Sequence, residues 1–139
     1  MRKRWSVPAV AGVILGVALL SGAVAWAKLR PGPPVMLSNL NHMQSIVKAL
    51  ALTDFAGVAE HAKAIKANAA VLKTVKVQDL DAGIPAAKQA EFVKYATALE
   101  TEAGNLAAAA EGGQPGKALD AYKNMIGTGC FACHSKLRD

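Results

Sequence analysis

From about residue 34 onward, apolar residues recur along the chain at alternating intervals of three and four positions. This spacing places them along one side of an α-helix, because successive helical residues turn by about 100°. Four stretches show the pattern, and the connections between them contain proline and glycine, as turns do. Alanine is abundant and aromatic residues make up only 5%, which favours helices over sheet. We therefore expect an all-α protein, an antiparallel up-down-up-down four-helix bundle.

The predicted helices are bounded by residues that commonly begin or end helices. The first three span about residues 34–51, 55–72 and 85–111, and the fourth begins after Gly116 and has His134 near its end. Thr53 or Asp54 can cap the second helix. Pro85 can open the third, and Gly112 and Gly113 end it. The residues expected to face the core are, in the first helix, Met36, Leu40, Met43, Val47 and Leu50, and in the second, Phe55, Val58, Ala62, Ile65, Ala69 and Leu72. In the third helix they are Phe92, Ala96, Leu99, Ala103, Leu106 and Ala110, and in the fourth, Leu119, Tyr122, Ile126, Cys130 and Cys133.

The N-terminal stretch has the composition of an export signal. Residues 1–5 are basic, residues 7–25 are apolar and uncharged, and Ala25-Trp26-Ala27 gives a small-x-small cleavage pattern. We expect a signal peptide at residues 1–27, a linker at 28–34, a four-helix-bundle domain at 35–139 and a periplasmic location. The apolar run is also about long enough to span a bilayer. An uncleaved anchor in the inner membrane, facing the periplasm, is therefore the alternative.

The net charge gives no indication of nucleic-acid binding. The formal charge is +6, but three of the basic residues lie in the predicted leader, and the remainder of the chain carries only +3. This modest excess excludes the strongly basic class of nucleic-acid-binding domains.

The end of the fourth predicted helix contains Cys130, Cys133 and His134, which include both cysteines of the chain. Two thiols three positions apart share one face of a helix, so both can add to the vinyl groups of one porphyrin. The following histidine can bind iron, and the pattern is typical of covalent haem (heme c) attachment. A structural zinc site would need four ligands, and the remaining histidines, His42 and His61, lack ligand spacing. A redox dithiol would be expected beside a βαβ unit, which the sequence does not indicate.

Gly127 and Gly129 precede this pattern within the same predicted helix. Each lowers helix stability by about 1 kcal/mol relative to alanine. Beside a flat porphyrin, the missing side chains would let the macrocycle approach the backbone. A kinked or frayed helix is the alternative interpretation.

An export signal, four helices and Cys130-x-x-Cys133-His134 close to the C-terminus together resemble the class II c-type cytochromes, which include cytochrome c-prime and the low-spin cytochrome c-556. The resemblance covers essentially the whole predicted mature chain. It implies a bundle with iron bound by His134. In c-prime the other side of the iron is open to small gases such as nitric oxide, whereas in c-556 a methionine of the first helix binds there. The resemblance also implies a possible homodimer through the first two helices. An arginine that members often carry in the first helix, near a haem propionate, is absent here, and Arg30 is the nearest.

Met36, Met43 and His42 are the candidates for the second iron ligand, and depth along the bundle distinguishes the two methionines. His134 lies about 17 residues into the fourth predicted helix, or ~26 Å along its axis. Met36 precedes the end of the first helix at Ala51 by 15 residues, whereas Met43 precedes it by only eight. We therefore expect Met36 as the distal ligand and Met43 in core packing. His42 is expected at the edge of the inward face, and His61 on the surface.

These expectations favour a monohaem electron-transfer protein and not an enzyme, because ligands on both sides of the iron leave no place for substrate. The alternatives are a gas-binding protein with an open distal side and a haem subunit of a larger redox complex. The topology would gather basic residues around the haem, namely Lys28, Arg30, Lys73, Lys76, Lys88, Lys136 and Arg138. The main acidic residues expected there are Asp79, Asp81 and Asp139. We therefore expect an acidic redox partner protein.

Overall fold

The computed structural model describes residues 32–80 and 82–137. The predicted signal peptide or anchor, residues 1–27, lies outside the described residues, as do residues 28–31 of the predicted linker. Within the described part, no helix is both long enough and apolar enough to cross a bilayer.

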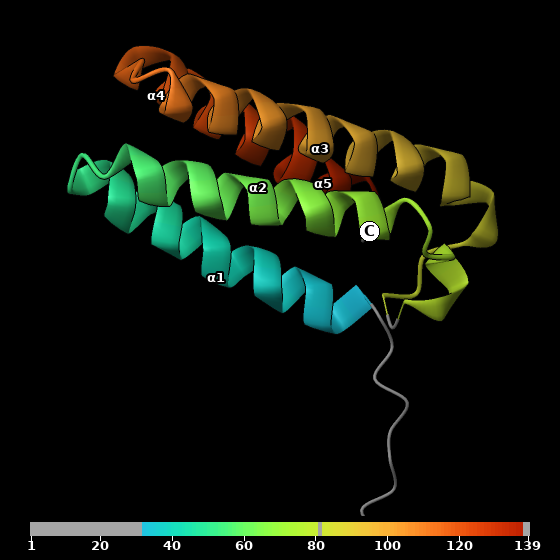
Figure 1. Cartoon of the computed structure of the whole chain (residues 1–139). Helices are drawn as coiled ribbons and strands as arrows, with labels where there is room; N and C mark the ends of the chain where they lie inside the picture. Colours follow the sequence, from blue (N-terminus) through green and yellow to red (C-terminus); the bar gives the residue numbers. More distant parts are fainter. Residues whose placement is uncertain (1–31, 81, 138–139) are drawn as a thin grey trace, which may run out of the picture.

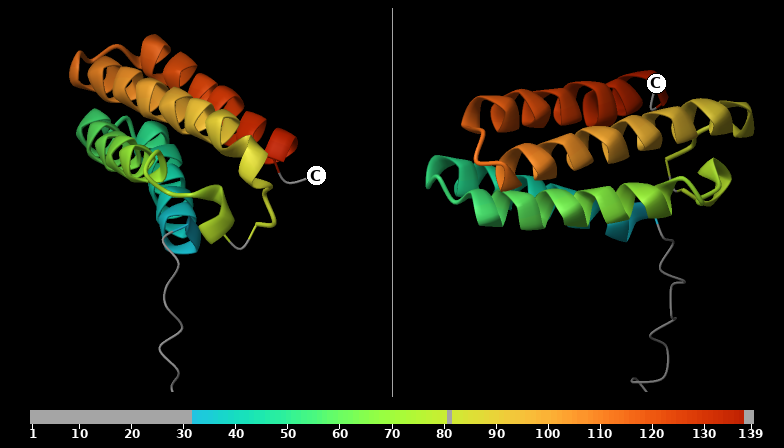
Figure 2. Two further views of the ribbon diagram at one scale, coloured as in Figure 1. Left: turned by 90° about the vertical axis from the view of Figure 1, so that its right-hand side faces the viewer. Right: turned by 45° about the horizontal axis from the view of Figure 1, so that its top comes forward.

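The described residues contain helices and no β-strands, and their four helical segments are compatible with a four-helix bundle. The segments are α1 (Gly32–Ala51), α2 (Phe55–Leu72), α3 (Gln89–Glu111) and a last segment made of α4 (Pro115–Asn124), the π-helix η3 (Met125–Phe131) and α5 (Ala132–Leu137). Figures 1 and 2 show α1 beside α2, and α3 beside the last segment. The largest interface lies between α2 and α3, whereas α1 packs chiefly on α2.

A tight turn joins α1 to α2, and Asp54 caps the second helix. Its carboxylate accepts a hydrogen bond from the backbone N–H of Gly57 at 2.9 Å, which satisfies one of the amides at the start of α2. Thr53 instead adopts a positive φ of 55° and donates its hydroxyl to the carbonyl oxygen of Leu52. Of the two predicted caps, Asp54 is therefore the correct one.

The connection between α2 and α3 is more ordered than its polar sequence suggests. It contains two short 3₁₀ helices, η1 (Val77–Asp79) and η2 (Ala86–Lys88). The Gln89 side chain accepts from the backbone N–H of Val77 at 2.9 Å and donates to the carbonyl oxygen of Val75 at 3.1 Å. Because Val75 and Val77 are buried, the connection closes one end of the core.

The predicted core faces of α2 and α3 are confirmed, apart from Phe55, which is half buried. The buried members are Val58, Ala62, Ile65, Ala69 and Leu72 on α2, and Phe92, Ala96, Leu99, Ala103, Leu106 and Ala110 on α3. These two helices lie at the centre of the fold, and their alanines allow close approach. The stabilisation that comes from burying apolar surface is therefore concentrated at the interface between α2 and α3.

The predicted faces of α1 and α4 are partly wrong. On α1, Val47 and Leu40 are about half exposed, while Ile46 is fully buried. On α4, Leu119 is 60% exposed, and Met125 at the start of η3 is the fully buried residue. Each helix has a single extensive helical neighbour, so a narrower face is buried than in a helix enclosed from two sides.

The C-terminal helix is not a continuous α-helix, because the backbone of residues 125–131 forms the π-helix η3. A Cβ on Gly129 would lie 3.0 Å from the Cα of Leu99, so this glycine lets η3 approach α3 closely. A Cβ on Gly127 would meet no atom within 4 Å. The close approach at Gly129 is thus to a neighbouring helix, which differs from the predicted approach to a porphyrin.

Candidate functional site

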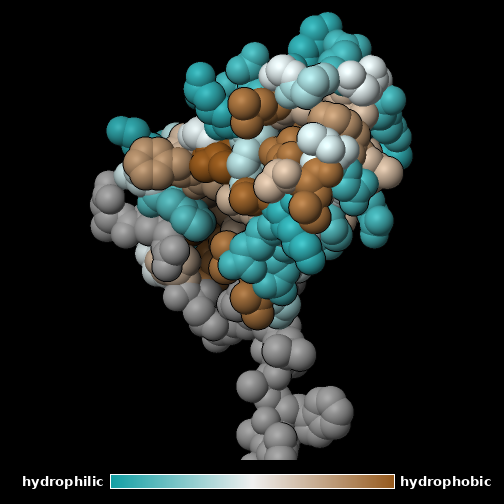
Figure 3. Space-filling view, turned by 90° about the vertical axis from the view of Figure 1, so that its left-hand side faces the viewer, coloured by the Kyte–Doolittle hydropathy of each residue, from teal (hydrophilic) through white to brown (hydrophobic). Residues whose placement is uncertain are grey.

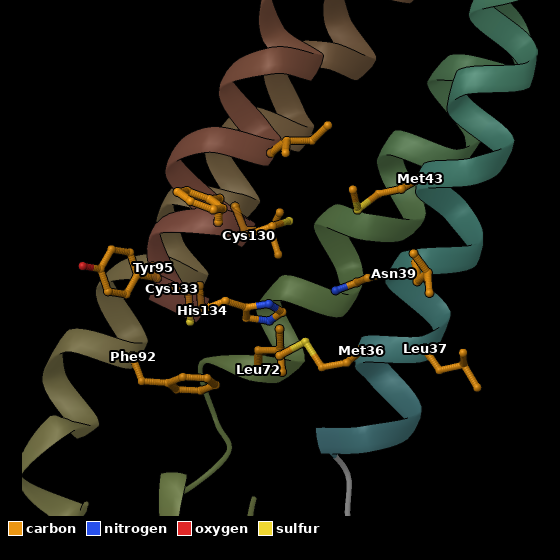
Figure 4. A pocket seen from close by; sticks show the side chains of 16 residues that line it. Met36, Leu37, Asn39, Met43, Leu72, Phe92, Tyr95, Cys130, Cys133 and His134 are labelled. Carbon is orange, nitrogen blue, oxygen red and sulfur yellow. The ribbon is translucent and has the colours of Figure 1, made fainter. Parts of the chain in front are cut away.

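A cavity of about 550 Å³ lies between α1 and the C-terminal segment, at the end of the molecule shown in Figure 4. The walls are formed by α1, the end of α2, the first half of α3, and η3 with α5. The volume falls within the range of pockets that hold small molecules and cofactors. Apolar side chains predominate in the lining, among them Leu72, Phe92 and Leu99.

One wall carries all three residues of the Cys-x-x-Cys-His pattern. Cys130 comes from η3, and Cys133 and His134 come from α5. Both cysteines are half buried, and His134 is exposed to the cavity and to solvent. Figure 4 shows the imidazole of His134 reaching into the cavity from this wall. The structure thus brings the predicted residues together on one side of one cavity.

Burial raises the pKa of the Cys130 thiol above its ordinary value. A thiol protonated at neutral pH is a poor redox nucleophile and a poor metal ligand, because both roles need the thiolate. Cys130 therefore does not have the lowered pKa of a reactive thiolate.

The opposite wall is α1, which contributes both candidate methionines, Met36 and Met43. In Figure 4 the thioether of Met36 points across the cavity toward His134. Met43 lies further along α1, level with Cys130 rather than with His134 (Figure 4). The Tyr122 hydroxyl lies 3.5 Å from the backbone carbonyl oxygen of Met43, so α4 approaches α1 at the level of Met43.

Asn39 lies between these methionines on α1 and is the only buried polar residue in the described part of the chain, with 5% of its surface exposed. The side-chain amide of Asn68 on α2 donates to the Oδ1 atom of Asn39 at 2.8 Å and to the Ser38 hydroxyl at 3.1 Å. Since the oxygen of Asn39 is engaged by α2, its NH₂ group is the part that faces the cavity (Figure 4). This donor was not predicted from the sequence.

Two tyrosines near the cavity have a raised pKa. For Tyr95 on α3, burial is the main cause, and the neighbouring Glu91 carboxylate adds to it; the Tyr95 hydroxyl donates to Glu91 at 3.3 Å. Figure 4 shows this hydroxyl directed away from the cavity. For Tyr122, burial again raises the pKa. Both side chains are therefore neutral at physiological pH.

Phe131 and Leu37 are the most exposed of the apolar residues that contribute to the lining. Phe131 is 70% exposed and Leu37 is 60% exposed, although both contribute to the lining.

Two of the lysines predicted at this end are paired with glutamates. Lys73 forms an ion pair with Glu100, and Lys88 pairs with Glu91 at 2.7 Å. The hydrogen bond from Lys88 holds the pKa of Glu91 below its usual value. Neither glutamate is in the predicted set of acidic residues. Of the predicted charged set, Lys28, Arg30, Asp81, Arg138 and Asp139 lie outside the described residues.

The opposite end of the molecule, seen in Figure 3, offers no comparable chemistry among the described residues. A second hollow there is lined partly by Phe55, Lys63 and Glu111, and the last two form an ion pair. It contains no thiol or imidazole.

His42 and His61 lie outside the cavity and in contact with each other. Their Nδ1 atoms are 3.2 Å apart, and both rings are half buried between α1 and α2. The expectation that His61 is a simple surface residue is therefore wrong. The two residues lie about equally far from the α1–α2 turn, and this was the only sequence signal that could have paired them.

Comparison with known proteins identifies no relative: no family model, no curated protein and no solved structure matches this chain. Among the described residues, there is also no cluster of three or more His, Cys, Asp or Glu side chains that could hold a metal ion by themselves.

Proposed function

We propose that this chain is a monohaem c-type cytochrome that transfers electrons, built as an antiparallel up-down-up-down four-helix bundle. The observation that supports this best is the shared cavity. Cys130, Cys133 and His134 lie on one wall, and the candidate ligands Met36 and Met43 lie on the other. The apolar lining and the volume suit a porphyrin, so the residues present fit the group.

The two thiols would hold the haem covalently. Each S–H adds across one vinyl group, with the sulfur bonded to one carbon and the proton transferred to the other, so no external oxidant is needed. His134 would supply an imidazole nitrogen to the iron. The bound haem supplies the one-electron ferric–ferrous couple.

Met36 is the proposed distal ligand. Its sulfur points toward His134, whereas Met43 lies at the level of Cys130 (Figure 4). A thioether ligand stabilises ferrous iron and raises the reduction potential. If His134 and Met36 both bound the iron, no position would remain for a substrate, so the proposed role is electron transfer and not catalysis.

The walls of the cavity would keep water from the cofactor while one edge stays accessible. Leu72, Phe92 and Leu99 would provide an apolar surround, and the exposed side chains of Phe131 and Leu37 leave part of the lining in contact with solvent. The proposed partner is an acidic redox protein that docks at this edge. We also propose a periplasmic location, since the predicted leader would export the chain.

Covalent attachment is tested by denaturing the full chain in acidic organic solvent after expression with the haem-attachment machinery. A thioether-bound haem stays with the polypeptide. Cys130→Ser and Cys133→Ser should each reduce the retained haem, and the double variant should abolish it. Haem that is extracted completely from the wild-type chain would rule out the proposal.

A gas-binding protein is the second candidate, and Asn39 is the observation that favours it. A hydrogen-bond donor in an otherwise apolar wall can stabilise a polar molecule bound nearby. In this case Met36 would not bind iron, and the ferric protein would have a high-spin absorption spectrum. A low-spin ferric spectrum would favour the electron-transfer proposal.

A further inference from the structure

The contact between His42 and His61 is the strongest unexplained feature outside the cavity. The two side chains come from different helices, and their Nδ1 atoms converge to 3.2 Å. The ring centroids are 5.3 Å apart, and the planes are tilted by 40°. Neither residue lines the cavity, so the proposed function does not account for this arrangement.

We infer that His42 and His61 form a binding site for one late first-row divalent metal ion, such as Zn²⁺ or Cu²⁺, that bridges α1 and α2. Imidazole nitrogen is a preferred ligand of these ions. In a tetrahedral centre with metal–nitrogen distances of ~2.0–2.1 Å, two nitrogens lie ~3.3–3.4 Å apart. In a square-planar centre the separation is ~2.9 Å. The observed 3.2 Å lies between these values, so the separation of the two nitrogens already suits the ion.

Metal binding changes the tautomer of one ring and leaves the charge of the pair unchanged. Without a metal, one ring donates its Nδ1–H to the lone pair of the other. To bind the ion, the donating ring changes to the tautomer protonated at Nε2. Both Nδ1 lone pairs then face the metal, and the pair remains neutral without net proton release.

The remaining coordination positions would be filled by water. No third His, Cys, Asp or Glu joins the pair among residues 32–80 and 82–137. Both rings are only half buried, so solvent reaches them. A centre with two protein ligands is expected to bind metal reversibly, unlike a closed structural site with four.

A metal ion bound by His42 and His61 would also hold α1 against α2. This helix packs chiefly on α2, and it carries Met36, Asn39 and Met43 into the cavity wall. A ligand that binds only the folded state stabilises it. A metal bridge between His42 and His61 should therefore raise the melting temperature and hold the α1 wall in place.

The test is a Zn²⁺ titration of the full chain by calorimetry, with circular dichroism melting curves at each metal concentration. Iodoacetamide treatment blocks any thiol that is not already in a thioether, so the result does not depend on haem attachment. The variants are His42→Ala and His61→Ala. The matched control is Asn41→Ala, an exposed neighbour on α1.

We expect one Zn²⁺ per chain, with affinity reduced roughly tenfold or more in each histidine variant and unchanged in Asn41→Ala. The rise in melting temperature should disappear with the binding. No binding by the wild-type chain, or wild-type affinity in either histidine variant, would overturn the inference.

Cu²⁺ provides a second test that needs no substitution. Electron paramagnetic resonance of the one-to-one complex with the unaltered chain should show splitting from two imidazole nitrogens. A spectrum with oxygen ligands alone would place the ion elsewhere and overturn the assignment, even if the alanine variants failed to fold.

Discussion

Met36 and Met43 lie on the same side of α1 in different surroundings. Both are half buried, and only Met36 points toward His134 (Figure 4). Met43 instead lies where α4 approaches α1, since the Tyr122 hydroxyl is 3.5 Å from its carbonyl oxygen. The two methionines should therefore respond differently to truncation.

We predict that Met36→Ala converts the iron from low spin to high spin and lowers the reduction potential, because the distal thioether is lost. Met43→Ala should leave the spectrum largely unchanged. It should lower the free energy of unfolding toward the lower end of the ~2–5 kcal/mol range of core truncations, since Met43 is only half buried. Absorption spectra and urea unfolding of both variants check this. The reverse pattern would assign the ligand to Met43.

Asn39 gives a second prediction at this scale. Its NH₂ group faces the cavity, and a donor directed there favours the more electron-rich ferrous state. Replacing it with leucine should remove this donor. An interaction of the size of one hydrogen bond, ~0.5–1.5 kcal/mol, corresponds to a fall in potential of roughly 20–60 mV. Ser38→Ala is the matched control, because it removes the other acceptor of Asn68 and leaves the cavity wall intact. Equal potentials in the wild type and in Asn39→Leu would show that the amide does not act on the iron.

The residues whose positions could be predicted from the sequence are those that lie close together along one helix. Cys130, Cys133 and His134 share one wall because neighbours along one helix stay together wherever that helix packs. The contacts Asn39–Asn68 and His42–His61 depend on how α1 and α2 are aligned lengthwise. That alignment is set by packing between helices, which the residue pattern of one helix does not specify.

Among the elements, η3 differs most from expectation, and its two glycines lie in different environments. Gly129 is buried against Leu99, whereas a side chain on Gly127 would enter open space. We predict that Gly129→Ala destabilises the protein by about 1–3 kcal/mol, because α3 must move to admit the methyl group. Gly127→Ala, the matched control, should be neutral or slightly stabilising. Thermal unfolding of both variants measures the difference, and equal stabilities would contradict this account of Gly129.

The predicted helix faces were correct where a helix is enclosed and partly wrong where it is not. Five of the six predicted positions on α2, and all six on α3, are buried, because these helices meet neighbours on both sides. On α1 and α4 the apolar Val47 and Leu119 remain exposed. The π-helix could not be predicted, because the 3.6-residue period assumes a regular helix throughout. Because of the π-helix, the buried residues of the last segment include Met125 and Gly129, which were not among the positions predicted to face the core.

At the scale of the whole molecule, charge gives a prediction about partners. The ion pairs of Lys73 and Lys88 reduce the basic excess around the cavity, while Lys76 and Lys136 remain exposed. Electron transfer to an acidic redox protein should still slow as ionic strength rises, and Lys136→Glu should slow it further. Lys117→Glu, an exposed site in the first turn of α4, should have little effect. Stopped-flow rates that are flat across salt concentration would contradict the docking proposal.

The stability of α1 should depend more on what the cavity holds than the stability of any other part of the molecule does. The helix packs chiefly on α2, and the cavity separates much of its inner face from η3 and α5. A haem bound between these walls would add apolar contacts to α1 and contribute less to the interface of α2 with α3. We predict that in the Cys130→Ser, Cys133→Ser double variant, purified without haem, amide hydrogen exchange accelerates most strongly in α1 and least in the central part of α2 and α3. Mass spectrometry of peptides from α1 and α3 measures both rates. A uniform acceleration along the chain would mean that the cavity contents stabilise the fold as a single unit, whereas unchanged exchange in α1 would mean that nothing bound in this cavity supports the helix.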